Sequence, residues 1–296
     1  MSEITDTVAE AAASQVPIVG AATDVGRLRT ANEDGYLALE PVYVVVDGMG
    51  GHTSGRLAAR TALERISALA GAIISDAAQV IEAIEEAGED VDALPSTGSH
   101  RPGATVAGVA LLHPDGIPAW LVFNLGDARV YLLRDGELHQ VTTDHSKVQE
   151  LIESGELSRA EAREDFRKNI VTRALGGGLS GPFTPSARLL PATGGERFLV
   201  CSDGLSDELD DDELALILGA GLTPQRTAEA LVAAALENGG HDNATALVID
   251  LVERPSLVGV VTAPEPDEDF GAERAGGGAL DASGERSNLS GLLPLF

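Results

Sequence analysis

Aromatic residues are scarce in this chain, and cysteine is nearly absent. Phe, Tyr and Trp make up 3% of the 296 residues, although hydrophobic residues as a whole make up 44%. A core of that size must therefore be built from Val, Leu, Ile and Ala. The single cysteine, Cys201, excludes an intramolecular disulfide and fits a reducing compartment, so we expect a cytoplasmic protein.

Positive charge is also in short supply. Lys and Arg number 20 against 47 Asp and Glu, which gives a net charge of −27. Such a chain repels nucleic acids and anionic membranes and is suited to holding cations. The longest apolar runs, residues 104–112 and 119–123, are too short to span a bilayer, and no secretory signal is recognisable at the start.

The composition divides the chain into three parts. Residues 1–16 are expected to form a flexible arm, and residues 17–252 an ordered domain. Residues 253–296, rich in Ala, Gly, Pro and acids without periodicity, are expected to be a disordered acidic tail. The apolar cluster at residues 292–296 is either a docking element or a frayed end.

Hydrophobic patterning predicts strands and helices in alternation. Strand-like runs at residues 104–112, 119–125 and 128–134 are separated by turn signals, while residues 54–69 and 76–87 have helical periodicity. Hairpins among the strands favour antiparallel sheets covered by helices over a doubly wound parallel sheet, and thus an α+β fold.

Aspartates stand where predicted strands begin or end. Asp47 and Asp203 each follow a hydrophobic run, whereas Asp242 precedes one. Three carboxylates gathered at one edge of a sheet would repel each other unless a hard divalent cation neutralised them, and carboxylate oxygens suit Mg²⁺ or Mn²⁺. Ordinary Asp-Gly turns are the alternative.

Eight blocks make the interpretation specific. In order they are TDVGRLRTANED (23–34), VVVDGMGGH (44–52), GAT (103–105), GDAR (126–129), DHS (144–146), IVTRALG (170–176), LVCSDGL (199–205) and GGHDNAT (239–245). Together they resemble the bacterial branch of the metal-dependent serine/threonine protein phosphatases of type 2C, over residues 18–252. The resemblance implies two antiparallel sheets packed as a sandwich between helices, a four-layer αββα fold.

The resemblance also assigns metal ligands. Asp47 corresponds to the carboxylate that bridges two Mn²⁺ or Mg²⁺ ions, and the Gly48 carbonyl to a ligand of one of them. Asp203 and Asp242 correspond to the other aspartate ligands, and Asp127 to an aspartate that shares Asp203 with a third, weakly bound ion. The residues expected behind these ligands are Glu33, Asp34 and Asn243.

Two catalytic assignments follow from the same blocks. Arg29 matches the arginine that grips the substrate phosphate, and Arg27 is the competing candidate. Eukaryotic relatives carry the proposed general acid directly after the Asp-Gly pair, where this chain has Met49. His52 is a possible replacement, and a structural role for this histidine is an equal alternative.

The implied reaction is hydrolysis of phosphoserine or phosphothreonine by water activated between two metal ions. The implied partners are phosphorylated proteins made by a serine/threonine kinase, and the protein is expected to be a monomer that does not bind nucleic acid. A flap-like insertion is expected at about residues 146–170. Its EDFR stretch (164–167) departs from a His-Pro pattern common in the family, which leaves substrate choice open.

Three other readings remain at this stage. The phosphatase could serve one dedicated regulatory phosphoprotein. The fold could instead be a catalytically silent module that binds phosphoproteins, although every matched acid is present. A phosphoesterase acting on nucleotides or nucleic acids is disfavoured by the negative charge.

Overall fold

Two antiparallel sheets form the centre of the fold. The computed structural model describes residues 15–96, 101–179 and 181–253. The first sheet has the order β1 (Gln15–Asp24), β11 (Ala244–Glu253), β10 (Arg197–Cys201), β6 (Arg129–Arg134), β7 (Glu137–Gln140). The second has the order β2 (Asp34–Leu39), β3 (Val42–Met49), β4 (Gly103–Leu112), β5 (Ala119–Leu125), β9 (Ser186–Pro191), and the short β8 (Leu175–Gly176) pairs with β4.

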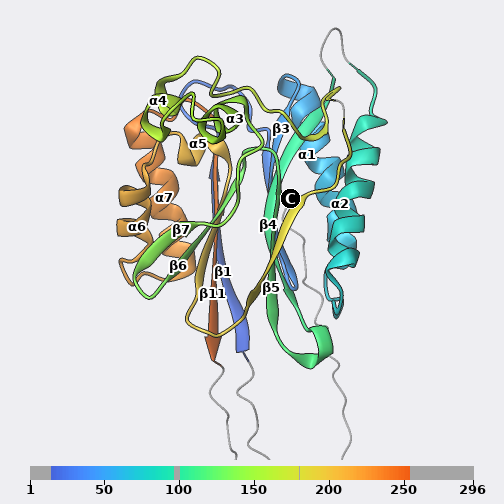
Figure 1. The fold of residues 1–296 in the computed structure, drawn as a ribbon, viewed down its shortest axis with the longest axis vertical. Helices are drawn as coiled ribbons and strands as arrows, with labels where there is room; N and C mark the ends of the chain where they lie inside the picture. Colours follow the sequence, from blue (N-terminus) through green and yellow to red (C-terminus); the bar gives the residue numbers. More distant parts are fainter. Residues whose placement is uncertain (1–14, 97–100, 180, 254–296) are drawn as a thin grey trace, which may run out of the picture. The chain divides into compact units, whose positions relative to one another are not determined.

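Helices cover both outer faces of this sandwich (Figure 1). The second sheet is covered by α1 (His52–Ile66) and α2 (Ala77–Asp92), and the first by α5 (Asp203–Ser206), α6 (Asp211–Leu218) and α7 (Pro224–Asn238). Two short helices, α3 (Lys147–Glu153) and α4 (Arg159–Glu164), lie at one end of the sandwich. Single 3₁₀ turns occur at Ser67–Leu69 and Pro114–Gly116. The predicted four-layer αββα fold is confirmed.

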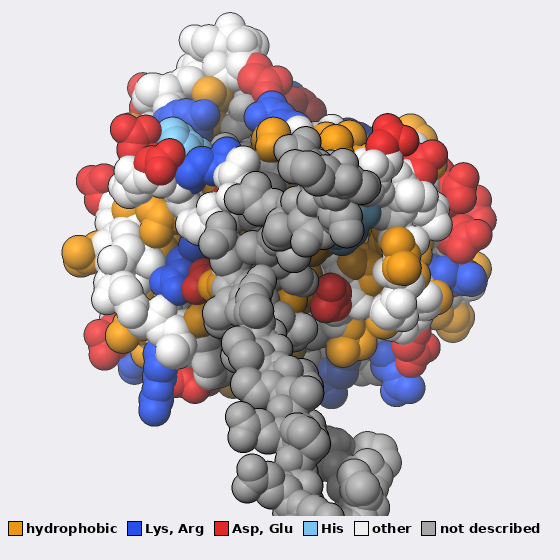
Figure 2. Space-filling view, turned by 90° about the horizontal axis from the view of Figure 1, so that it is seen from below, with side chains coloured by type: hydrophobic (Ala, Val, Ile, Leu, Met, Phe, Trp, Pro, Cys, Tyr) orange, Lys and Arg blue, Asp and Glu red, His pale blue; other side chains and the backbone are white. Residues whose placement is uncertain are grey.

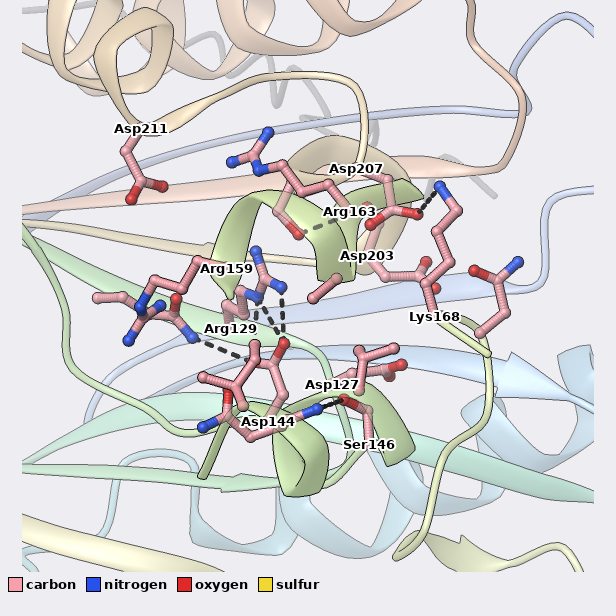
Figure 3. A pocket seen from close by; sticks show the side chains of 17 residues that line it. Asp127, Arg129, Asp144, Ser146, Arg159, Arg163, Lys168, Asp203, Asp207 and Asp211 are labelled. Carbon is pink, nitrogen blue, oxygen red and sulfur yellow. Dashed lines mark hydrogen bonds and ion pairs between the residues drawn. The ribbon is translucent and has the colours of Figure 1, made fainter. Parts of the chain in front are cut away.

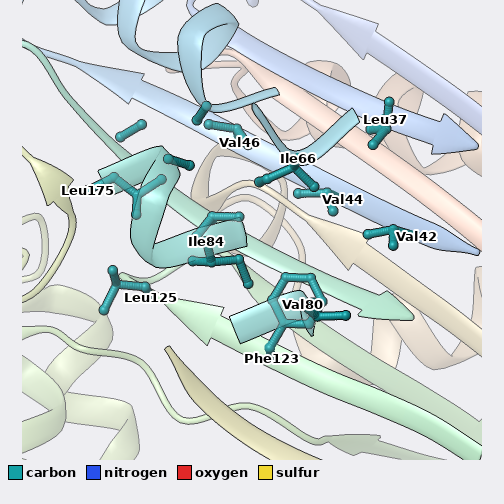
Figure 4. Packing of buried hydrophobic residues seen from close by; sticks show 14 of the residues in the cluster. Leu37, Val42, Val44, Val46, Ile66, Val80, Ile84, Phe123, Leu125 and Leu175 are labelled. Atoms are coloured by element: carbon teal, nitrogen blue, oxygen red, sulfur yellow. The ribbon is translucent and has the colours of Figure 1, made fainter. Parts of the chain in front are cut away.

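Three hydrophobic layers separate the four structural layers, as the alternation of side chains along β3 illustrates. Val42, Val44 and Val46 face α1 and α2, where they meet a cluster that includes Ile66 and Ile84 (Figure 4). Tyr43 and Val45 point the other way, into the layer between the sheets. Burying one such aliphatic side chain stabilises the fold by about 1.5–3 kcal/mol, so this strand is fixed from both faces.

The few aromatic residues are concentrated between the sheets. Trp120 and Phe198 are fully buried there, and their ring centroids lie 5.2 Å apart at an interplanar angle of 59°. Tyr43 also packs against Trp120, with ring centroids 6.4 Å apart. The remaining volume of this layer is filled mainly by Val, Leu, Ile and Ala, as the composition predicted.

Several element boundaries differ from the sequence prediction. Helix α2 runs to Asp92 rather than ending at Ala87, because Gly88 and Val91 continue its buried face. Strand β1 begins at Gln15, inside the segment expected to be a flexible arm. The rest of that arm, residues 1–14, and residues 254–296 of the expected tail lie outside the described residues.

The end of the sandwich away from α3 and α4 has a mixed surface. On the part of this face that the described residues form, basic side chains lie between acidic and hydrophobic ones instead of forming one continuous stripe (Figure 2). Within the described ranges, no helix has both the length and the apolar character needed to cross a membrane.

Candidate metal centre

The antiparallel register brings the predicted aspartates to one end of both sheets. In the second sheet Asp34, Asp47 and Thr105 lie side by side on β2, β3 and β4. In the first sheet Asp203 stands two residues after the end of β10, and Asp242 stands two residues before β11. A cavity of about 300 Å³ lies between these strand ends; the residues around it include Arg29, Glu33, Asp47, Gly48, Thr105, Asp127, Asn169, Asp203, Asp242 and Asn243.

The carboxylates in this cavity disfavour each other's ionisation. Burial raises the pKa of Asp47 well above its usual range, and the charges of Asp34, Asp203 and Asp127 raise it further. Burial likewise raises the pKa of Asp203, with Asp127 as the next cause. Asp47 and Asp203 both keep partial contact with solvent through the cavity. A bound cation would remove this repulsion and restore the charged form of both groups.

Asp34 lies behind this group and has one unsatisfied oxygen. Its Oδ2 accepts hydrogen bonds from the hydroxyls of Ser202 and Thr245, each at 2.7 Å. Its Oδ1 is buried without a hydrogen-bond partner. Burial raises the pKa of Asp34 to about 6. An unpaired buried carboxylate oxygen beside Asp47 is the feature expected where water or a cation completes the network.

Gly48 allows the backbone of β3 to approach α1 closely. A side chain at this position would place its Cβ 2.1 Å from the carbonyl oxygen of Gly55 and 2.8 Å from that of Glu33. Both distances are far shorter than any real contact, so only glycine fits between the strand and these two backbones. The main chain of Gly48, without a shielding side chain, lines the cavity.

Asn243 fixes the loop that carries the predicted arginine. Its Oδ1 accepts from the Glu33 amide at 2.8 Å, and its Nδ2 donates to the carbonyls of Val25 and Ala31 at 2.9 and 3.0 Å. All three bonds join residues more than 200 positions apart in sequence. The side-chain amide thus ties the loop after β1 to the start of β11, behind the cavity.

The two candidate arginines on this loop have different surroundings. Arg27 donates through Nε to the Leu236 carbonyl at 2.7 Å, and it does not line the cavity. Arg29 lines the cavity and donates from Nη2 to Asp242 Oδ2 at 2.5 Å. A guanidinium has five N–H donors, so this bond leaves most of them for a phosphate.

Asp127 reaches the same cavity from the connection between the two sheets. It is 7% exposed, and burial together with the charge of Asp144 raises its pKa to about 7. The preceding Gly126 has φ +113° and lies against Thr105, where a Cβ would be 2.4 Å from that side chain. This positive φ turns the chain from β5 toward β6, and glycine is required for it.

The donors in this cavity fit a hard divalent cation better than a soft one. They are carboxylate, carbonyl and hydroxyl oxygens, which suit Mg²⁺ or Mn²⁺. Among the described residues, no group of three His, Cys, Asp or Glu side chains is arranged to hold an ion by itself. Any ion here would therefore need further oxygen ligands, such as the Gly48 carbonyl and water molecules, which small divalent cations retain readily.

The structure leaves the predicted general acid without a test. The side chain of His52, at the start of α1, lies outside the described residues. No histidine side chain within the described part of the chain lines the cavity. His145 is held by Gly126, Ser186 and Arg173, and burial lowers its pKa to about 4.

Sequence reasoning missed residues that complete the site. Ser202 and Thr245 hold Asp34, and both lie inside recognised blocks whose small hydroxyl residues were not singled out. Asn169 lines the cavity from the flap-like insertion, whose ends are joined by a bridge between Ser146 and Val171. Nothing in the local sequence distinguishes Asn169 from an ordinary loop residue.

Comparison with known proteins is consistent with this arrangement. The sequence pattern that describes protein phosphatase 2C matches residues 31–238. The chain belongs to the protein phosphatase 2C family. The predicted family membership is therefore confirmed, because this match covers most of the chain.

Two curated relatives place the chain among bacterial members of the protein phosphatase 2C family. It is 30% identical to the serine/threonine protein phosphatase PstP of Mycobacterium tuberculosis over 93% of this chain and 53% of that protein. The chain thus spans about half the length of PstP. It is 33% identical to the serine/threonine phosphatase stp of Listeria monocytogenes, over 77% of this chain and 93% of that one.

A solved structure of this family agrees with the fold. The catalytic domain of PstP, determined in complex with two manganese ions, superposes with a TM-score of 0.70 at 31% identity. The match covers 81% of this chain and all of that domain. The sandwich described above is therefore the architecture of this phosphatase family.

Proposed function

We propose that this chain hydrolyses phosphoserine and phosphothreonine in proteins, with two Mn²⁺ or Mg²⁺ ions as cofactors. The observation that supports this most directly is the meeting of Asp47, Asp203 and Asp242 in one cavity. In this proposal Asp47, Asp203, Asp242 and the Gly48 carbonyl would hold the two ions, and Asp127 would help to hold a third, weaker ion.

The metal pair, when bound, supplies charge neutralisation and an acidified water for attack on phosphorus. Arg29 binds the oxygens of the phosphoryl group, because its guanidinium stands at the rim of the cavity with donors to spare. Asn243 holds the backbone of the loop that carries Arg29 and Glu33, so this arginine and the acids keep a fixed separation.

Asp34 orders the floor of the cavity through Ser202 and Thr245. The proton for the leaving alkoxide comes from His52 or from water, since no histidine side chain of the described part of the chain lines the cavity. Cys201 takes no part in the proposed reaction. It is fully buried, and burial raises the pKa of its thiol to about 12.

The substrates in this proposal are phosphoproteins made by a serine/threonine kinase, and the protein acts as a monomer in the cytoplasm. A free thiol in the core is consistent with a reducing compartment. Size-exclusion chromatography with light scattering would test the monomeric state, and a dimer mass would overturn it.

The direct test is hydrolysis of a generic phosphothreonine peptide by the purified chain with Mn²⁺, and with a chelator. We expect turnover that requires the metal and that falls at least about a hundredfold in Asp47→Asn, as expected when a central electrostatic group is lost. Asp115→Asn, in an exposed turn, is the matched control and should keep wild-type turnover. Full activity in the chelator would overturn the proposal.

A further inference from the structure

A second cavity lies directly beside the metal centre, under the flap-like insertion (Figure 3). It measures about 160 Å³, which is room for several water molecules or for one carboxylate or phosphoryl group. Asp127, Asp203 and Asn169 line both cavities. A peptide whose phosphorylated residue enters the metal centre can therefore place a neighbouring side chain in this second cavity, which we call the flap cavity.

Two of the five acids that line the flap cavity are paired with cations in the structure. Asp144 accepts three hydrogen bonds from Nε and Nη2 of Arg129, the shortest at 2.6 Å. Asp207 pairs with Lys168 at 3.0 Å. Asp127 and Asp203 belong to the metal centre, where bound cations would offset their charge. Asp211 lies in the first turn of α6 and, among the described residues, forms no ion pair.

Two cations of the flap cavity have no acidic partner. Arg159 and Arg163 line it from α4, and within the described residues neither lies within 4.0 Å of a carboxylate oxygen. Two acids close to them in sequence are engaged elsewhere, and the adjacent Glu164 is exposed and does not line the cavity. Glu161 closes the capping box with Ser158, and Asp165 is paired with Arg167.

The spacing of these two arginines places them on one face of the helix. Residues four apart in a helix are neighbours, and two like charges so placed destabilise it by about 0.2–0.5 kcal/mol. The chain has 47 acidic and 20 basic residues, so acidic partners are plentiful. Two arginines without such partners, next to the proposed active site, do not stabilise the fold. Two guanidinium groups on one face can, however, bind one anionic group through several charged hydrogen bonds.

We infer that Arg159 and Arg163 form a subsite for a second anionic group of the substrate, on a residue close to the phosphoserine or phosphothreonine. Carboxylates and phosphoryl groups share the required chemistry, and both occur beside phosphorylation sites. This inference rests on the proposed phosphatase function. It makes the flap cavity a determinant of substrate choice, within the insertion whose sequence departs from the common family pattern.

The test uses three phosphothreonine peptides that differ at one flanking position, which holds Ala, Asp or a non-hydrolysable phosphonate analogue of phosphoserine. The wild-type protein is expected to show a higher kcat/KM for one or both anionic peptides than for the Ala peptide. In the double variant Arg159→Ala/Arg163→Ala this preference should fall about tenfold, which corresponds to the loss of one charged hydrogen bond. Most of the change should appear in KM. Hydrolysis of the Ala peptide should stay within about twofold of wild type.

The control is Arg60→Ala/Arg226→Ala, which removes the same charge from two arginines that are each 75% exposed on other helices. It should keep the preference. Preference for the Asp peptide alone would identify a carboxylate as the ligand, and preference for the phosphonate alone would identify a phosphoryl group. Equal kcat/KM for all three peptides in the wild type would overturn the inference, as would an equal loss on all three in the flap variant. Failure to hydrolyse the Ala peptide at all would instead overturn the proposed function.

Discussion

Arg29 and Asp242 form an ion pair of 2.5 Å across 213 positions of sequence. The pair links the proposed phosphate-binding group to a proposed metal ligand. Arg29 therefore stands at the edge of the metal centre and is not an isolated surface charge. Its side chain is 55% exposed and that of Asp242 is 34% exposed, so both are open to a ligand that enters the cavity.

This geometry predicts different effects for substitution of the two arginines in the loop after β1. Arg29→Ala should lower kcat/KM for a phosphopeptide about 10–100-fold, through loss of charged hydrogen bonds to the phosphate, and should leave Mn²⁺ binding nearly intact. Arg27→Ala removes only a bond to the Leu236 carbonyl, so its kcat/KM should stay within about twofold. Steady-state kinetics on both variants is the measurement. The reverse pattern would show that the wrong arginine has been assigned.

A second prediction concerns the third ion. Asp127→Asn should keep the tight binding of two Mn²⁺ ions, lose a weaker binding event and turn over phosphoprotein more slowly, because few protein ligands give weak binding. Calorimetric titration with Mn²⁺, together with kinetics, measures both effects. Asp135→Asn, in the β6–β7 turn, is the control for a merely structural aspartate. If Asp127→Asn keeps every binding event and full turnover, Asp127 only stabilises its turn.

The buried ion pair below the flap should matter for stability. Side-chain exposure is 22% for Arg129 and 8% for Asp144, and Asp144 also accepts from Gln140 at 3.0 Å. Asp144→Ala leaves the arginine charge buried without its partner, so the free energy of unfolding should fall by about 3–5 kcal/mol. Breaking the exposed Arg60–Glu64 pair with Glu64→Ala should cost less than about 1 kcal/mol. Urea unfolding would compare the two, and equal losses would refute the distinction.

His145 should make the fold weaker in acid. Burial, and next the charge of Arg173, lower its pKa from 6.5 to about 4. Between these values the unfolded chain binds a proton that the folded chain does not, so stability is lost as the pH falls from about 7 toward 4. This one group should account for about 1–2 kcal/mol between pH 7 and pH 5.

The measurement is urea unfolding of wild type and His145→Gln at both pH values, in chelator so that metal binding does not contribute. Other groups, including Asp34 and Asp127 with their raised pKa values, titrate in both proteins and cancel in the comparison. The wild type should lose more stability than the variant on acidification. Parallel pH dependence in the two proteins would exclude this role for His145.

Site residues could be predicted from the sequence where their chemical type and their place next to a strand indicate one role. Asp47, Asp203 and Asp242 could be predicted as a group because each stands next to a hydrophobic strand, and strand ends in one sandwich meet at one edge. Alternating strands and helices predicted antiparallel sheets covered by helices, and the resemblance to the phosphatase family predicted the four layers. The assignment of residues 119–125 to a strand was correct to the residue.

Other features depend on contacts that no local pattern encodes. Strands β1, β2, β7, β8 and β9 were not predicted. β9, for example, lies at the edge of its sheet, and its exposed residues lack alternation. The surroundings of Arg27 could not be predicted, because its partner Leu236 lies 209 residues away in the sequence. The support of Asp34 by Ser202 and Thr245 likewise depends on three strands from two sheets meeting at one end.

The central claim is that Asp47, Asp203 and Asp242 hold a pair of metal ions. An anomalous difference map from crystals of this chain grown with Mn²⁺ tests it most directly. The account predicts two strong peaks within about 2.0–2.4 Å of carboxylate oxygens in this cavity, with Asp47 in contact with both. Peaks elsewhere on this acidic surface, with none beside Asp47, would contradict it.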